Sequence, residues 1–78
     1  MRRVEVKWTD AHGDAASWTP ISDLTSDHRQ IRTTGYLLPG GTKQGHLSVA
    51  QSWDKRTGHV DSVIHIPIAC VQTVRRLP

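Results

Sequence analysis

This 78-residue chain contains basic and aromatic residues whose types and spacing suit the binding of an anion better than any other chemical task. Trp53 is followed closely by Lys55 and Arg56, and an exposed ring beside cationic side chains is a stacking surface for a nucleic-acid base. Arginines also stand in pairs near both ends of the chain: Arg2, Arg3, Arg75 and Arg76. The net charge of +3 and the pI of about 9.6 permit an anionic partner without requiring one. The alternative for Trp53 is a structural role, closing a turn or an oligomer contact.

Residues with the chemistry for catalysis or metal binding do not form a recognisable set. Asp10, His12 and Asp14 alternate in one stretch and could ligate a divalent cation, but a metal site needs further ligands, so we interpret this stretch as a solvated loop. The other histidines and the serines follow no catalytic motif. The single cysteine, Cys70, excludes an intramolecular disulfide and is expected to be a small core residue. We therefore predict a protein that is not an enzyme and has no cofactor or metal.

Alternation of apolar and polar residues predicts the strands that position these side chains. Val4, Val6 and Trp8 alternate with polar residues, which indicates a first strand with one buried face and Trp8 as a core anchor. Residues 10–17 have no periodicity and contain turn formers, which predicts a loop.

A short helix is expected after this loop. Thr19 can cap it, and Pro20 suits its first position. One or two helical turns should follow, with Ile21 and Leu24 turned inward.

Residues 30–52 read as a β-hairpin. Apolar alternation resumes around Gly35, where a glycine inside a strand predicts a bulge or a sharp bend. Residues 39–45, Pro-Gly-Gly-Thr-Lys-Gln-Gly, do not match a phosphate-binding loop and are interpreted as the hairpin turn. Residues 53–59 form a second polar turn.

The stretch 60–77 predicts a strand, a one-turn break and a final strand. Val60, Ile64 and Ile66 fall on one face, and Pro67 ends the pairing because proline has no N–H to donate. A single turn over residues 68–70 leads to the last strand, whose pattern does not choose between its two faces.

Five short strands and one short helix predict one all-β domain over residues 1–78, a small five-stranded barrel of the SH3-like or Sm-like kind. In such a barrel the last strand pairs antiparallel with the first. Arg75 and Arg76 would then approach Arg2 and Arg3, forming a cationic cluster suited to an anion.

Several segments together resemble a group of small uncharacterised proteins encoded by bacteriophages and prophages. The segments are residues 4–12 (Val-Glu-Val-Lys-Trp-Thr-Asp-Ala-His), Trp18, 33–38 (Thr-Thr-Gly-Tyr-Leu-Leu), 47–52 (Leu-Ser-Val-Ala-Gln-Ser) and 66–71 (Ile-Pro-Ile-Ala-Cys-Val). The resemblance implies a viral accessory protein made in the cytoplasm of a host bacterium, and it implies no mechanism. The ending is also similar to that of Sm-like proteins, but their RNA-binding signature is not recognisable in this chain.

Two functions from different classes fit these observations. The first is a non-enzymatic binding module for an anionic ligand, a nucleic acid or a small nucleotide, and the alternative is a module that binds a host protein. No apolar run approaches the ~20 residues that span a bilayer, so we expect no membrane insertion. A homo-oligomer is also expected, a dimer before a ring, paired through an open edge at residues 60–66.

Overall fold

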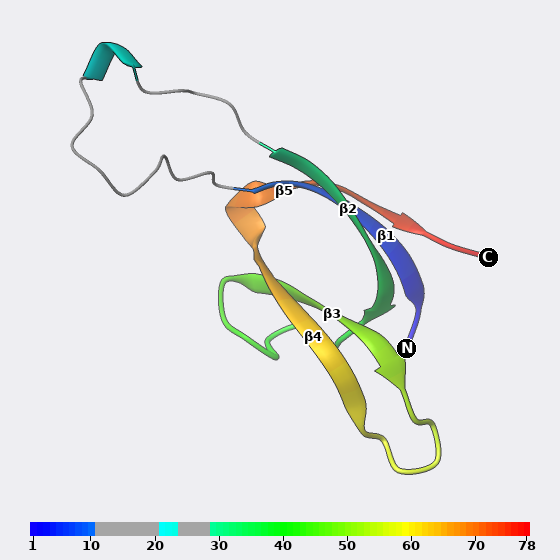
Figure 1. Cartoon of the computed structure of the whole chain (residues 1–78). Coiled ribbons are helices and arrows are strands. Elements are labelled where there is room, and N and C mark those ends of the chain that lie inside the picture. The colour runs from blue at the N-terminus through cyan, green and yellow to red at the C-terminus, as the bar shows by residue number, and fades with distance from the viewer. Residues whose placement is uncertain (11–20, 24–28) are drawn as a thin grey trace.

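The computed structural model describes residues 1–10, 21–23 and 29–78, and this part of the chain is mainly β (Figure 1). Five antiparallel strands form one sheet in the order β4-β3-β2-β1-β5. The elements in chain order are β1 (Arg3–Asp10), the 3-10 turn η1 (Ile21–Asp23), β2 (Arg29–Leu37), β3 (His46–Trp53), β4 (Val60–Pro67), the 3-10 turn η2 (Ile68–Cys70) and β5 (Val71–Arg76). The all-β class and the five predicted strands are confirmed.

Strand β1 is the centre of the fold because it pairs with β2 on one side and with β5 on the other. Its alternation holds as predicted: Val4, Val6 and Trp8 are buried, and they form the core with Val49 and Ile66. The Trp8 indole Nε1 donates a hydrogen bond to Thr33 Oγ1 at 2.9 Å, so the polar atom of this core anchor is satisfied.

The glycine of β2 allows two backbones to come close together. A Cβ atom at Gly35 would collide with the backbone oxygen of Ala50 and would lie 2.7 Å from Val49 Cγ1. A bulge or a sharp bend was predicted at Gly35, and pairing of β1 with β2 continues through this residue without a shift, so this pairing has no bulge. The close approach of the two backbones is the reason for glycine. Figure 1 shows β3 and β4 as a ribbon below β1, β2 and β5, with its hairpin end pointing away from those three strands.

The strand, turn and strand predicted for residues 60–77 are confirmed as β4, η2 and β5. Pro67 does not end the pairing as predicted but is the last paired residue of β4, opposite His46. Between β1 and β5 the register shifts at Lys7/Trp8, so that Val74 lies opposite Val6 and Val71 lies opposite Trp8. The shift places Val71 and Val74, three residues apart, on the same face of the sheet. Val71 is half-buried and Val74 is exposed. A strict two-residue alternation cannot describe such a strand, which explains why the sequence pattern did not choose between its two faces.

The helical prediction is only partly met. Helical structure begins at Ile21 as the single turn η1, but the Ile21 side chain is 87% exposed, so its predicted inward position is wrong. A helix buries an apolar face through residues on successive turns, and a single turn of three residues has no successive turn. Trp18, Thr19, Pro20 and Leu24 lie outside the described residues, as does most of the predicted loop 10–17.

Candidate functional site

An aromatic pair with a cation above it forms the first candidate site, at the end of β3. The rings of Tyr36 and Trp53 meet edge to face, with centroids 5.6 Å apart and planes at 69°. The Lys55 Nζ atom lies 5.5 Å from the centroid of the Trp53 ring, within the range of a cation–π contact. Both rings are half-buried, so each combines support from the protein with an exposed portion. The predicted group of Trp53 with a neighbouring cation is therefore present, and Tyr36 is an addition to it.

The turn between β3 and β4 holds this group in place. Its closing bonds join the Asp54 amide to the His59 carbonyl at 2.9 Å and the Gly58 amide to the Asp54 carbonyl at 2.8 Å. The Arg56 amide also donates to Asp54 Oδ1 at 3.0 Å, so the Asp54 side chain stabilises the turn. The Arg56 side chain is exposed, three residues after Trp53 in the sequence.

The strand pairing places the two arginine pairs at one end of the sheet. Arg3 lies opposite Tyr36 in the register of β1 and β2, and Arg76 lies opposite Val4. The Leu37 amide donates to the Arg2 carbonyl at 2.8 Å, and the Leu77 amide donates to the Arg3 carbonyl at 2.9 Å. The predicted pairing of the last strand with the first is thus confirmed, and it brings the backbones of both pairs together.

The four arginines are not equivalent. Arg75 lies opposite Glu5, and their side chains form an ion pair at 3.6 Å. Paired residues of neighbouring strands point to the same face, so Arg3 and Arg75 share the face of Glu5, whereas Arg76 shares the opposite face with Val4. The face that carries Arg3 also carries Tyr36, which places Arg3 beside one member of the aromatic pair.

Sequence reasoning missed two further cations on this face. Lys7 lies directly opposite Arg32, and a small cavity of about 200 Å³ is lined by Lys7, Gln30, Ile31, Arg32 and Gln72. Like charges in opposite positions disfavour the sheet unless solvent or an anion screens them. Because a long connection separates β1 from β2, the register that places Lys7 opposite Arg32 could not be predicted from the sequence.

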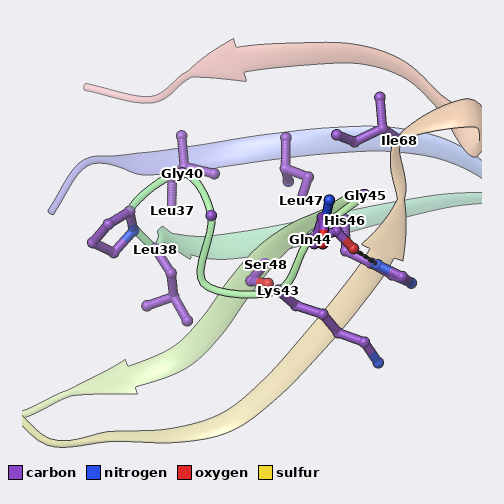
Figure 2. A pocket seen from close by; sticks show the side chains of 12 residues that line it. Leu37, Leu38, Gly40, Lys43, Gln44, Gly45, His46, Leu47, Ser48 and Ile68 are labelled. Atoms are coloured by element: carbon purple, nitrogen blue, oxygen red, sulfur yellow. Dashed lines mark hydrogen bonds between the residues drawn. The ribbon is translucent and has the colours of Figure 1, made fainter.

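A larger cavity of about 370 Å³ lies at the other end of β3, beneath the loop between β2 and β3 (Figure 2). Its apolar lining includes Leu37, Leu38, Leu47 and Ile68, and Leu37 and Leu47 also pack against the core. The Ile68 amide donates to the Gly45 carbonyl at 3.0 Å, which ties η2 to the loop. The stretch interpreted only as a hairpin turn is therefore also the wall of a cavity.

Polar side chains meet at one side of this cavity. Ser48, only 4% exposed, shares a hydrogen bond of 2.6 Å between its Oγ and His65 Nδ1. His46 Nδ1 donates to the Gln44 carbonyl at 2.8 Å, and the rings of His46 and His65 lie 6.5 Å apart, edge to face. The histidines that appear scattered in the sequence are thus paired by the register of β3 and β4, in which Ser48 faces His65.

The described residues hold no group of three or more His, Cys, Asp or Glu side chains that could bind a metal. Of the weighed loop ligands only Asp10 is described, and His12 and Asp14 lie outside the described residues. Cys70 is half-buried and packs against the core, as expected for a small apolar residue. Within the same ranges no helix has the length and apolar character to cross a bilayer.

Comparison with protein-family models, with curated proteins and with solved structures finds no match to this chain.

Proposed function

We propose that this protein is a non-enzymatic binding module of phage origin, built as a small SH3-like or Sm-like barrel, whose ligand is a nucleic acid or a nucleotide. The observation that carries the proposal is the half-buried Tyr36–Trp53 pair with the Lys55 amine 5.5 Å from the Trp53 ring centroid. A base can stack on the indole, and the displaced lysine amine can then meet the phosphate that accompanies the base.

The interaction free energies favour replacing the Lys55–Trp53 contact by a base stacked on the indole. An exposed cation–π contact contributes about 0.5–1 kcal/mol, whereas the stacking of a base on an aromatic side chain contributes about 1–3 kcal/mol. Stacking therefore outweighs the contact that it replaces. The edge contact from Tyr36 keeps the indole oriented, so little side-chain entropy is lost when the base arrives.

The basic face of β1 and β2 supports a ligand longer than one nucleotide. From Arg3, beside Tyr36, the strand rises by about 13 Å to Lys7 and its partner Arg32. A backbone that passes over this face would meet cations at both positions, and the carboxylate of Glu5 between them is already paired with Arg75. Arg56 would add charge near the aromatic end, and Arg2 and Arg76 would add charge at the same end of the sheet, with Arg76 on its opposite face.

Titration of the protein with single-stranded DNA, RNA and a mononucleotide at several salt concentrations tests this proposal. We expect salt-sensitive binding, because phosphates release counterions when arginines and lysines neutralise them, with oligonucleotides bound more tightly than the mononucleotide. Trp53→Ala should weaken binding by about 5- to 150-fold. Lys43→Ala, which removes an exposed cation at the opposite end of β3, is the matched control and should bind normally. The absence of salt-sensitive binding to any of these ligands would exclude the proposal.

A second candidate function, protein interaction, is favoured by the open edge of the sheet. Strand β4 is an outer strand of the described sheet, as the density of Val and Ile predicted, and Val60 and Val63 on it are exposed. Its free backbone groups can pair with a strand of a host protein. Capture from a host lysate separates the candidates, because this one requires a stoichiometric protein and the first requires nucleic-acid or nucleotide material.

The same edge supports the expected homodimer. Two β4 strands that pair across a two-fold axis would satisfy both edges and cover both copies of the exposed valines. Two copies of a weak anion site would then act together on one ligand. Light scattering at low micromolar concentration should report a dimer, and a monomer of 8.7 kDa would contradict this prediction.

A further inference from the structure

We infer that the cavity beneath the loop between β2 and β3 binds a small amphipathic acid, an aliphatic chain that ends in one carboxylate. This inference goes beyond the proposed nucleic-acid function, because the cavity and the Trp53 group lie at opposite ends of β3.

The interior of the cavity suits an aliphatic chain. Its volume of about 370 Å³ falls in the range of small-molecule sites, which are mostly apolar with few polar groups. Leu37 and Leu47 form a floor continuous with the core, and Figure 2 shows Ile68 on the same side as these two leucines. Ile68 remains 60% exposed although it lines the cavity, so an alkyl chain would remove apolar surface from water on both sides.

The polar side of the cavity suits one anionic group. Lys43 and His46 line it, and none of its twelve lining residues is an aspartate or glutamate. Lys43 is exposed and extends away from the loop (Figure 2), and it belongs to no ion pair among the described residues. A carboxylate at the mouth would give this ammonium group a partner, whereas a second cation would be repelled.

These two features together define the ligand class. A sugar or a nucleotide would require several polar groups to replace its hydration, and two of the polar side chains that line the cavity, His46 and Ser48, already hold hydrogen bonds to the protein. An aliphatic acid needs only an apolar interior and one cation. Because each buried methylene adds roughly the same free energy, affinity should rise about four-fold per methylene until the chain fills the cavity.

The test is titration of the isotope-labelled full chain with hexanoate, octanoate, decanoate and decanol, each kept monomeric, with binding followed through backbone amide resonances. We expect shifts at Leu37, Leu47 and Ile68, the stated rise in affinity with chain length, and decanoate bound more tightly than decanol. Lys43→Ala should abolish the preference for the acid over the alcohol. Lys55→Ala is the matched control, because it removes an exposed lysine of the other site and should change nothing here.

Ile68→Glu provides a second variant, at an exposed position of the turn η2. The new carboxylate would repel the carboxylate of the ligand and reduce the apolar surface that lines the cavity. This variant should lose decanoate binding while its other resonances stay unchanged. The inference is overturned by an absence of shifts at the cavity, by an affinity independent of chain length, by equal binding of decanol and decanoate to the unmodified protein, or by full binding in a folded Ile68→Glu variant. None of these results depends on nucleic-acid binding.

Discussion

The two halves of β3 differ in how the protein surrounds them. Ser48, Val49 and Ala50 are all buried, and since neighbouring residues of a strand point to opposite faces, this half is covered on both faces. Gln51 and Ser52 are exposed, and Trp53 stands at the end of a ribbon that leaves the rest of the sheet. Pairing with β2 is confined to the covered half, through Tyr36↔Ala50 and Leu37↔Val49.

The difference separates stability from the proposed binding of nucleic acid. The buried half of β3 depends on the close approach of its backbone to Gly35 and on hydrogen-bonded polar groups such as Ser48. Substitutions in this half should therefore lower the free energy of unfolding. The second half carries few contacts of that kind, and changes there should alter ligand binding while the fold persists. Substitutions matched in type between the two halves measure this separation.

Gly35→Ala should have the largest effect. The added Cβ meets the backbone oxygen of Ala50, which cannot rotate away, and Val49 Cγ1 at 2.7 Å. We expect the free energy of unfolding to fall by about 2–3 kcal/mol, the upper part of the usual range for overpacking, in chemical denaturation. Gly40→Ala is the control, because a Cβ there meets nothing within 4 Å and the residue has no left-handed backbone angle. Equal stability of the two variants would mean that the strands separate without cost at Gly35.

The two serines of β3 give a smaller and more direct comparison. Ser48 faces His65 and is hydrogen-bonded to it, whereas Ser52 faces Asp61 and is exposed. Ser48→Ala should cost about 1 kcal/mol, because it removes a net hydrogen bond in the covered half. Ser52→Ala should stay within about 0.5 kcal/mol of the unmodified protein. Thermal and urea unfolding of both variants provide the measurement, and a larger loss for Ser52→Ala would reverse our assignment of the covered half.

Much of the fold could be predicted because alternation reports burial wherever one face of a strand is covered. It succeeded for Val4, Val6 and Trp8, whose strand pairs on both sides. It failed at β5, where the register shift puts Val71 and Val74 on one face, and at Ile21, where an apolar residue stands exposed in a single turn. The first failure arises because tertiary pairing decides the direction of the β5 side chains, and the second because a turn of three residues has no further turn to bury an apolar face.

The candidate sites were predictable only in part, for a related reason. Trp53 and Lys55 are neighbours in sequence, so their contact could be anticipated, and the pairing of the two termini followed from the expected barrel. Partners brought together by register between distant strands could not be anticipated: Tyr36 beside Trp53, Lys7 opposite Arg32, and Ser48 bonded to His65. The cavity depends in addition on the path of a loop and on its bond to η2.

Lys55→Ala should lower stability by no more than Ser48→Ala does, and it sharpens the comparison most. Lys55 is exposed and its described contact is with the Trp53 ring, so its loss should cost no more than about 0.5–1 kcal/mol in urea unfolding. If a base takes its place on the indole while the amine meets a phosphate, the same variant should bind single-stranded DNA more weakly, and the salt dependence of binding should become shallower by about one counterion. Lys43→Ala should leave that slope unchanged. A stability loss larger than that of Ser48→Ala, with an unchanged salt slope, would make Lys55 a structural residue and would remove the separation between the two halves of β3.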